Sequence, residues 1–166
     1  MTQKAEKYRL LERQLAALLE GETDPIAKMA NVAAVLHAEF GFWWTGFYRV
    51  APDRHSGLDP VRHSGLDPES RELLLGPFQG PVACMHIPYG KGVCGTAWAR
   101  NETVAVPDVE AFPGHIACSA ASRSEIVVPV HGPDGAVVAV LDIDSDRLGT
   151  FDEIDREWLE KIVTLL

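Results

Sequence analysis

The stretch SEIVVPVHGPDGAVVAVLDIDS, residues 124–145, constrains the fold of this chain more than any other. Two apolar segments flank Pro-Asp-Gly, residues that suit a tight turn, so the stretch predicts a β-hairpin. Alternate residues of a strand share a face, which places Asp142 and Asp144 side by side at the end of one face. Leu141 and Ile143 fall on the opposite face. The partner strand of the hairpin could bring Glu125 close to the two aspartates.

Segments of both structural types surround this hairpin. Apolar residues recur at helical spacing over residues 8–19, and Asp24, Pro25 and Gly41 mark the start and the end of a second helix. The stretch KGVCGTAWARN predicts a further helix, and FWWTGFYRV, RELLLGPFQG and ETVAVPDV predict strands. We therefore expect an α+β protein, with a central, mostly antiparallel sheet, helices packed on one face and ligand-binding loops on the other.

A capping box is predicted ahead of the last helix. Thr150 and Glu153 have the spacing at which a hydroxyl and a carboxylate cap each other's backbone N–H groups. The residues that follow give this helix an apolar stripe, so it is expected to pack on the sheet.

A short repeat interrupts the chain after the first predicted strand. RHSGLDP at 54–60 recurs at 62–68, and two copies are too few for a solenoid. Its Gly, Pro, Ser and Asp content is typical of a loop, so we interpret residues 54–68 as an insertion at a hairpin tip. The length of 166 residues then predicts a single domain, 1–166.

Composition excludes some classes of partner. The chain is 46% hydrophobic with a formal net charge of −9, which disfavours nucleic acid and anionic membranes. No apolar run approaches membrane-spanning length, and the charged, amphipathic start is unlike a secretory signal. We therefore expect a cytoplasmic protein whose cysteines are thiols, so that any disulfide would be transient and chemical.

Cys84, Cys94 and Cys118 allow three interpretations. They could be small buried hydrophobes, since free cysteine is among the most buried residue types. They could bind zinc together with His86 and His115, although the chain has no CxxC pair, and we expect no metal. They could also form a redox pair, an interpretation favoured by the small residues around Cys118, where the sulfur could be exposed and backbone N–H groups could face a ligand.

The acids allow two interpretations, and the tryptophans one. Glu125, Asp142 and Asp144 could be ordinary solvated acids, or they could converge in a pocket where repulsion raises a pKa and keeps a proton available. A thiol beside a protonated carboxyl suits attack on an oxygen-bearing sulfur. Trp43 and Trp44 occupy opposite faces of the first strand, so we expect one in the core and the other lining a pocket, against an apolar methyl group.

Several long motifs together resemble one known family. WTGFY, LGPFQGPVAC, IPYGKGVCGTA, VPDVEAFPGHIACSAASRSEIVVP and GAVVAVLDIDS are similar to the free methionine-(R)-sulfoxide reductases, a family built on the GAF domain. The similarity covers nearly the whole chain outside the repeat. It implies reduction of free L-methionine-(R)-sulfoxide to L-methionine, no bound cofactor, thioredoxin as the electron donor, and a homodimer.

The resemblance also implies a role for each motif residue. Cys118 would attack the sulfoxide sulfur and become a sulfenic acid, Cys84 would resolve it as a disulfide, and Cys94 would have an accessory role. Further positions would bind the substrate: Glu125, Asp142 and Asp144 the sulfoxide oxygen and the amino group, Trp44 the methyl group, and the backbone of Ile116, Ala117 and Cys118 the carboxylate.

A GAF fold alone does not define a function, so two other classes stay open at this point. One is a small-molecule-binding sensor, which usually adjoins an output domain for which this chain leaves no length. The other is a thiol redox sensor, which would need the cysteines but not the acids. Bilin attachment is disfavoured, because it uses a Cys-His pair and Ser119 follows Cys118.

Overall fold

The structure is a computed structural model that describes residues 2–51, 71–116, 118 and 120–166. The repeat at 54–68 and Ala117 lie outside the described residues, so the insertion stays a prediction. In chain order the elements are α1 (Gln3–Leu18), α2 (Pro25–Phe40), β1 (Trp44–Val50), β2 (Glu72–Gln79), β3 (His86–Pro88), α3 (Gly92–Arg100), β4 (Val104–Val106), the 3₁₀ turn η2 (Val109–Ala111), β5 (Ser124–His131), β6 (Val137–Ser145) and α4 (Glu153–Val163).

Across the described residues, the strands form one six-stranded sheet in the order β3-β2-β1-β6-β5-β4. Every neighbouring pair is antiparallel. The predicted α+β class and antiparallel sheet are thus confirmed. The predicted hairpin of residues 124–145 forms β5 and β6, and it lies inside the sheet, with β1 on one side and β4 on the other.

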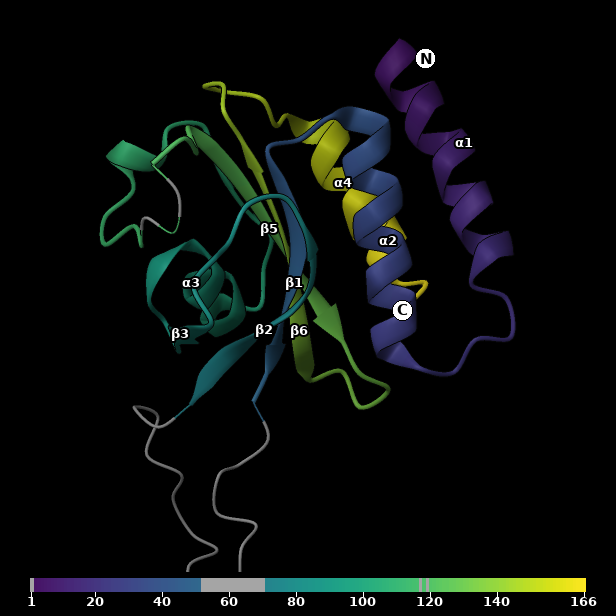
Figure 1. The fold of residues 1–166 in the computed structure, drawn as a ribbon, viewed down its shortest axis with the longest axis horizontal. Coiled ribbons are helices and arrows are strands. Elements are labelled where there is room, and N and C mark those ends of the chain that lie inside the picture. Colours follow the sequence, from purple (N-terminus) through teal and green to yellow (C-terminus); the bar gives the residue numbers. More distant parts are fainter. Residues whose placement is uncertain (1, 52–70, 117, 119) are drawn as a thin grey trace, which may run out of the picture.

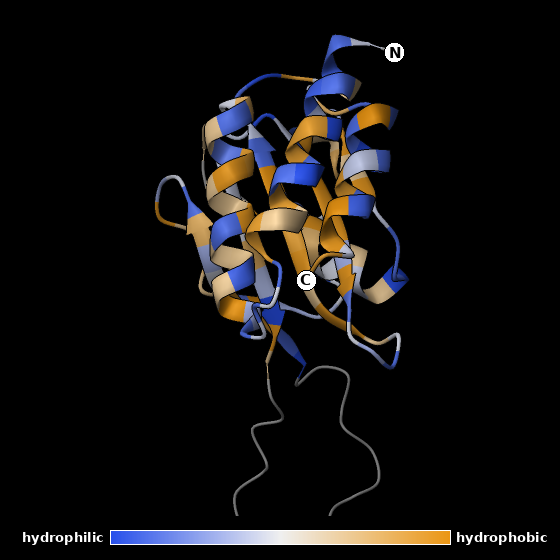
Figure 2. Ribbon diagram, turned by 90° about the vertical axis from the view of Figure 1, so that its right-hand side faces the viewer, coloured by the Kyte–Doolittle hydropathy of each residue, from blue (hydrophilic) through white to orange (hydrophobic). Residues whose placement is uncertain are grey.

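One face of the sheet is covered by α1, α2 and α4 (Figure 1). Their apolar side chains form one core with the residues of β1, β5 and β6 that point to that face, among them Phe47, Ile126, Leu141 and Ile143. Seen from this side, the helices carry both hydrophilic and hydrophobic residues (Figure 2), as expected of amphipathic helices. Within the described residues, none of the helices combines the length and the apolarity needed to span a lipid bilayer.

The opposite face carries α3 together with the loops (Figure 1). A second core gathers here around Tyr48, Val127, Val140 and the α3 residues Val93 and Trp98. The expected division into a helical face and a loop face is therefore confirmed, although among the described residues α3 and the 3₁₀ turn η2 lie on the loop side. The candidate active site lies on this second core.

The helix boundaries follow local capping chemistry. The Asp24 side chain accepts from Ile26 N at 2.9 Å, Pro25 begins α2, and Gly41 ends it with a left-handed φ of 65°, as predicted. The predicted capping box at Thr150 is wrong. The Thr150 hydroxyl donates instead to Ser145 Oγ at 2.7 Å.

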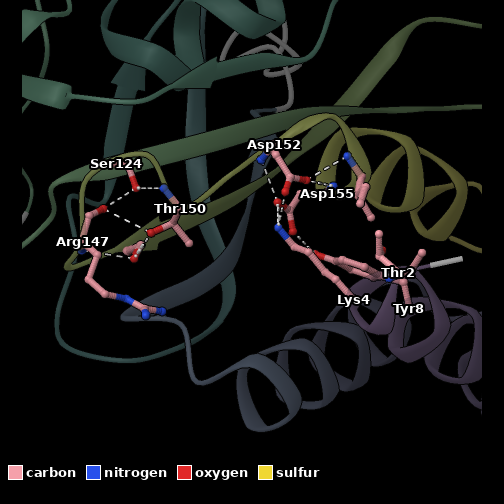
Figure 3. A network of polar contacts seen from close by, with 11 residues as sticks. Thr2, Lys4, Tyr8, Ser124, Arg147, Thr150, Asp152 and Asp155 are labelled. Atoms are coloured by element: carbon pink, nitrogen blue, oxygen red, sulfur yellow. Dashed lines mark hydrogen bonds and ion pairs between the residues drawn. The ribbon is translucent and has the colours of Figure 1, made fainter.

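The observed cap of α4 is formed by two aspartates. Asp152 accepts from the backbone N–H of Asp155, and the Asp155 carboxylate accepts from Asp152 N at 2.8 Å. Asp155 also accepts a 2.8 Å hydrogen bond from the Tyr8 hydroxyl and pairs with Lys4 (Figure 3). This buried network attaches α1 to the start of α4, so the N-terminal helix is part of the packed structure.

Candidate active site

The carboxylates lie where strand alternation predicted. In β6, Asp142 and Asp144 share with Val140 the face that carries α3, while Leu141 and Ile143 point into the helical core. In the β5–β6 register, Glu125 lies directly opposite Asp144. Trp44 of β1 pairs with Asp144 on the other side. Three neighbouring strands thus direct an aromatic ring and three acids to one place.

A pocket opens above this part of the sheet. Its empty volume is about 530 Å³, counting the open mouth. Its walls come from β1, β3, β5, β6, α3 and the loop residues Val82, Ala83, His115, Ile116, Cys118 and Ser122. The lining residues are Trp44, Tyr48, Val82, Ala83, Ile87, Gly92, Val93, Cys94, His115, Ile116, Cys118, Ser122, Glu125, Asp142 and Asp144.

Two of the cysteines are joined at this pocket. Cys84 and Cys118 form a disulfide, with their Cα atoms 5.4 Å apart and their positions 34 residues apart in the sequence. Cys118 belongs to the pocket wall, and the carbonyl of Cys84 accepts a 2.9 Å hydrogen bond from the Tyr48 hydroxyl. The interpretation of these cysteines as mere buried hydrophobes is therefore wrong for Cys84 and Cys118. They are a redox-competent pair beside the acids.

Cys94 lies deeper than that pair. It is a buried free thiol in α3, and its Sγ lies 4.0 Å from Glu125 Oε1. Burial, together with the nearby charges of Asp142 and Glu125, raises the pKa of the Cys94 thiol. A thiol that stays protonated is a weak nucleophile, so this environment suits a supporting position better than direct attack.

Burial and mutual repulsion hold protons on the acids. Glu125 and Asp142 are each only 6% exposed. Burial, then the charge of Asp144, raises the pKa of both well above the ordinary range. Burial also raises the pKa of Asp144 to about 6, against the lowering effects of the Ser122 hydrogen bond and of His115. Near neutral pH the raised pKa values favour a proton on Glu125 and Asp142, in line with the second of the two interpretations that the sequence left open.

One carboxyl oxygen lacks a hydrogen-bond partner within the described part of the chain. Asp142 Oδ1 is buried, and none of the described residues donates a hydrogen bond to it. A buried polar atom without a partner is costly, and a bound ligand that donates a hydrogen bond would remove the cost. The polar end of this pocket is therefore suited to a ligand with donor groups.

The same region has donors that could hold a metal ion. Ligand atoms of Cys94, Glu125 and Asp142 lie within 4.8 Å of one another. A cation there would require the thiol and the carboxyl groups to release protons that burial holds on them. The expectation of a metal-free site stays a prediction.

Two further polar residues contact the acids and were not predicted to do so. The Ser122 hydroxyl donates to Asp144 Oδ1. His115 Nε2 lies 3.7 Å from Glu125 Oε2, and among the described residues that line the pocket it is the only basic one. The sequence offered little signal for either role, because both residues lie in an irregular loop to which no periodicity applies.

Trp44 provides the apolar wall. It is buried, stacks on Phe78 with ring centroids 5.4 Å apart, and donates from Nε1 to Pro81 O at 3.1 Å. Gly46 leaves room for the Trp44 ring in this position, because a Cβ at Gly46 would lie 2.4 Å from the ring. The expectation that one of the two tryptophans is core and the other lines the pocket is only half right. Trp44 does both, and Trp43 is 36% exposed.

The segment around Cys118 is described at Ile116 and Cys118, whereas the predicted contact at Ala117 lies outside the described residues. Ile116 lines the pocket and lies against Gly92, where an added Cβ would come within 3.1 Å of the Ile116 side chain. The Cys118 N–H donates to Ile116 O at 3.0 Å. In the disulfide-bonded structure this donor is thus already used.

The fold and this pocket define a GAF domain, and the family model described as "GAF domain" matches residues 27–166. The Escherichia coli "Free methionine-R-sulfoxide reductase" is 42% identical over 98% of this chain and 88% of its own length. The chain therefore belongs to the GAF-domain family of the free methionine-R-sulfoxide reductases.

Two further relatives agree with this assignment. A "GAF domain-containing protein A" of Dictyostelium discoideum is 50% identical over 98% of this chain and 92% of its own length. The solved free methionine-R-sulfoxide reductase of Neisseria meningitidis, in complex with its substrate, is 45% identical with a TM-score of 0.85, and the match covers 99% of this chain and 89% of that one.

Proposed function

We propose that this protein reduces free L-methionine-(R)-sulfoxide to L-methionine by cysteine chemistry. The observation that supports this most strongly is the Cys84–Cys118 disulfide at a pocket with three acids in its wall. A redox pair alone would suit a thiol sensor. Protonated carboxyl groups beside it suit a reaction in which an oxygen bound to sulfur must be protonated.

In the proposed reaction, the Cys118 thiolate attacks the sulfoxide sulfur. The oxygen takes a proton from a neighbouring carboxyl group and moves to Cys118, so that methionine leaves and Cys118 becomes a sulfenic acid. The Cys84 thiol then attacks the Cys118 sulfur, water leaves, and the disulfide forms. Both sulfurs are already within bonding distance in the structure, which is consistent with this step.

We further propose how the substrate is held. Glu125, Asp142 and Asp144 bind the sulfoxide oxygen and the amino group, and the unpartnered Asp142 Oδ1 is suited to accept from an ammonium group. Trp44 contacts the methyl group. The carboxylate is bound by the backbone of residues 116–118 once the disulfide is reduced and the Cys118 N–H is released from Ile116. Cys94 has an accessory role.

We propose the electron donor, the cellular location, the oligomeric state and the domain organisation on the same basis. Thioredoxin supplies the electrons, the protein is a cytoplasmic homodimer, and residues 1–166 form a single GAF domain with an insertion at 54–68. The reaction needs no bound cofactor, because the electrons pass only between sulfur atoms.

Consumption of free methionine sulfoxide in a thioredoxin system tests the proposal. We expect turnover of the free R form, little turnover of the S form, and little turnover of peptide-bound sulfoxide. The acids bind the amino group inside the pocket, so a peptide chain has no path out of it. Equal rates with free and peptide-bound substrate would contradict this closed pocket, and no turnover with any reductant would contradict the function.

A further inference from the structure

The surface around Cys84 exposes apolar side chains. Among the described residues, Val82 at 87% and Met85 at 69% are the two most exposed large hydrophobic side chains. They lie two residues before and one residue after Cys84. Single exposed apolar side chains are common on proteins, so what distinguishes these two is their position on either side of a cysteine. Here the functional group is a disulfide.

The backbone that carries these side chains is anchored. The Cys84 carbonyl accepts from the Tyr48 hydroxyl at 2.9 Å, and the Met85 carbonyl accepts from Leu75 N at 2.9 Å. Both anchors belong to the sheet, since Tyr48 lies in β1 and Leu75 in β2. The exposed side chains are thus presented from a fixed backbone, which lowers the entropy that a partner must overcome on binding.

The two sulfurs of the disulfide differ in their surroundings. The described residues that line the pocket include Cys118 but not Cys84. Both cysteines are half-buried, and Val82 itself belongs to the rim of the pocket. Cys84 lies between Val82 and Met85 in the chain, so a macromolecule that docks on these two side chains is adjacent to Cys84, while Cys118 lies in the wall that carries the acids. Attack on Cys84 also releases Cys118, the sulfur that the proposed reaction needs as a free thiolate.

We propose that Val82 and Met85 form the docking surface for a protein dithiol of the thioredoxin class, which reduces the disulfide by attacking Cys84. The inference rests on the proposed function. The disulfide itself selects this occupant, because each catalytic cycle must return two electrons to these sulfurs.

The reductive step balances without any other reactant. A thiolate of the reductant forms a bond to Cys84 Sγ, the Cys84–Cys118 bond breaks, and Cys118 leaves as a thiolate. The second thiol of the reductant loses its proton to solvent, attacks the reductant's own sulfur in the mixed disulfide, and releases Cys84. The reductant ends as a disulfide, oxidised by two electrons, and the enzyme ends as a dithiol.

Met85→Asp tests the surface, because Met85 does not line the pocket. Methionine formation is measured with thioredoxin and, separately, with the small dithiol dithiothreitol, which needs no docking surface. We expect kcat/KM for thioredoxin to fall about tenfold, the loss of roughly one important interface contact, with the dithiothreitol-driven rate unchanged. Met85→Leu keeps an apolar side chain and should retain thioredoxin-driven turnover. Leu10→Asp, on the exposed side of α1, is the matched control and should have no effect.

The possible outcomes distinguish a failure of the proposed docking surface from a failure of the proposed function. An unchanged thioredoxin kcat/KM in Met85→Asp overturns the surface, as does an equal fall with both reductants or a change only in oligomeric state. Turnover of the unaltered protein with dithiothreitol but not with thioredoxin overturns the partner and leaves the reductase function intact. Failure with both reductants contradicts the proposed function itself.

The attacked sulfur can be identified by trapping. A thioredoxin whose second active-site cysteine is replaced by serine cannot complete the exchange, so its mixed disulfide with the oxidised enzyme should accumulate. Peptide mapping by mass spectrometry is expected to find the link at Cys84. A link at Cys118 would overturn the proposed direction of approach.

Discussion

Glu125 and Asp144 lie directly opposite each other on neighbouring strands of the β5–β6 hairpin, with both side chains on the pocket face. Side chains opposed in this way have Cβ atoms about 4.5–5.5 Å apart, and two ionised carboxylates at that separation destabilise the sheet. A shared proton or a bound cationic group relieves the repulsion. This pair therefore links the fold directly to the acid chemistry proposed for the pocket.

The first prediction concerns the acids. Glu125→Gln, Asp142→Asn and Asp144→Asn should each slow methionine formation in a single turnover of the reduced protein by about 10²–10⁴-fold, the usual range for lost general acid catalysis. Disulfide exchange with the reductant should slow much less, because it needs no proton on a sulfoxide oxygen. Asp146→Asn, an exposed acid just beyond β6, is the control. Near-normal rates in all three pocket variants would mean that these acids take no part in catalysis.

The second prediction concerns stability and pH. Asp144 has a pKa of about 6 in place of its ordinary 3.8, so the folded protein keeps a proton that the unfolded chain loses between these values. Deprotonation then favours the unfolded state, and the free energy of unfolding should fall as pH rises from 4 through 6. The contribution is about 3 kcal/mol, at about 1.4 kcal/mol for each pKa unit.

Urea unfolding of the disulfide-bonded protein between pH 4 and 7 measures this effect. Glu125 and Asp142 act in the same direction, since their pKa values are also raised. Asp144→Asn should flatten the decline, and Asp146→Asn should not. A free energy of unfolding that rises across this range would show that the pocket stabilises ionised acids.

The third prediction concerns the repeat. Residues 54–68 lie between β1 and β2, whose paired ends include Val50 and Leu73. Deleting the repeat and rejoining the chain should leave kcat/KM for the sulfoxide within a few-fold, because loop length changes closure entropy by only about 0.6 kcal/mol per doubling. Loss of catalysis in a deletion variant that retains the circular dichroism of the parent would show that the insertion shapes the site.

Much of the site follows from strand periodicity. The two-residue repeat of β6 is enough to place Asp142 and Asp144 on one face, and the Pro-Asp-Gly turn fixes a hairpin that brings Glu125 opposite Asp144. The start and end of α2 were equally predictable, because Asp24, Pro25 and Gly41 act within one turn of the chain.

Other features depend on contacts between distant segments. No local sequence pattern predicts that α3 packs on the pocket face or that Ser122 donates to Asp144. The cap of α4 was misplaced because Thr150 finds a closer partner in Ser145. Trp43 and Trp44 were expected to divide the core and the pocket between them, but Trp43 precedes β1 and stays partly exposed.

The division of work between Cys118 and Cys84 tests the central claim most directly. Each serine variant is fully reduced, freed of reductant and mixed with free methionine-(R)-sulfoxide, and the methionine formed per subunit is counted. Cys118→Ser should form none, because it lacks the attacking thiol. Cys84→Ser should form about one and then stop with a sulfenic acid at Cys118, or with a disulfide to Cys94 if that thiol can reach it. One methionine per subunit from Cys118→Ser, with none from Cys84→Ser, would contradict the account.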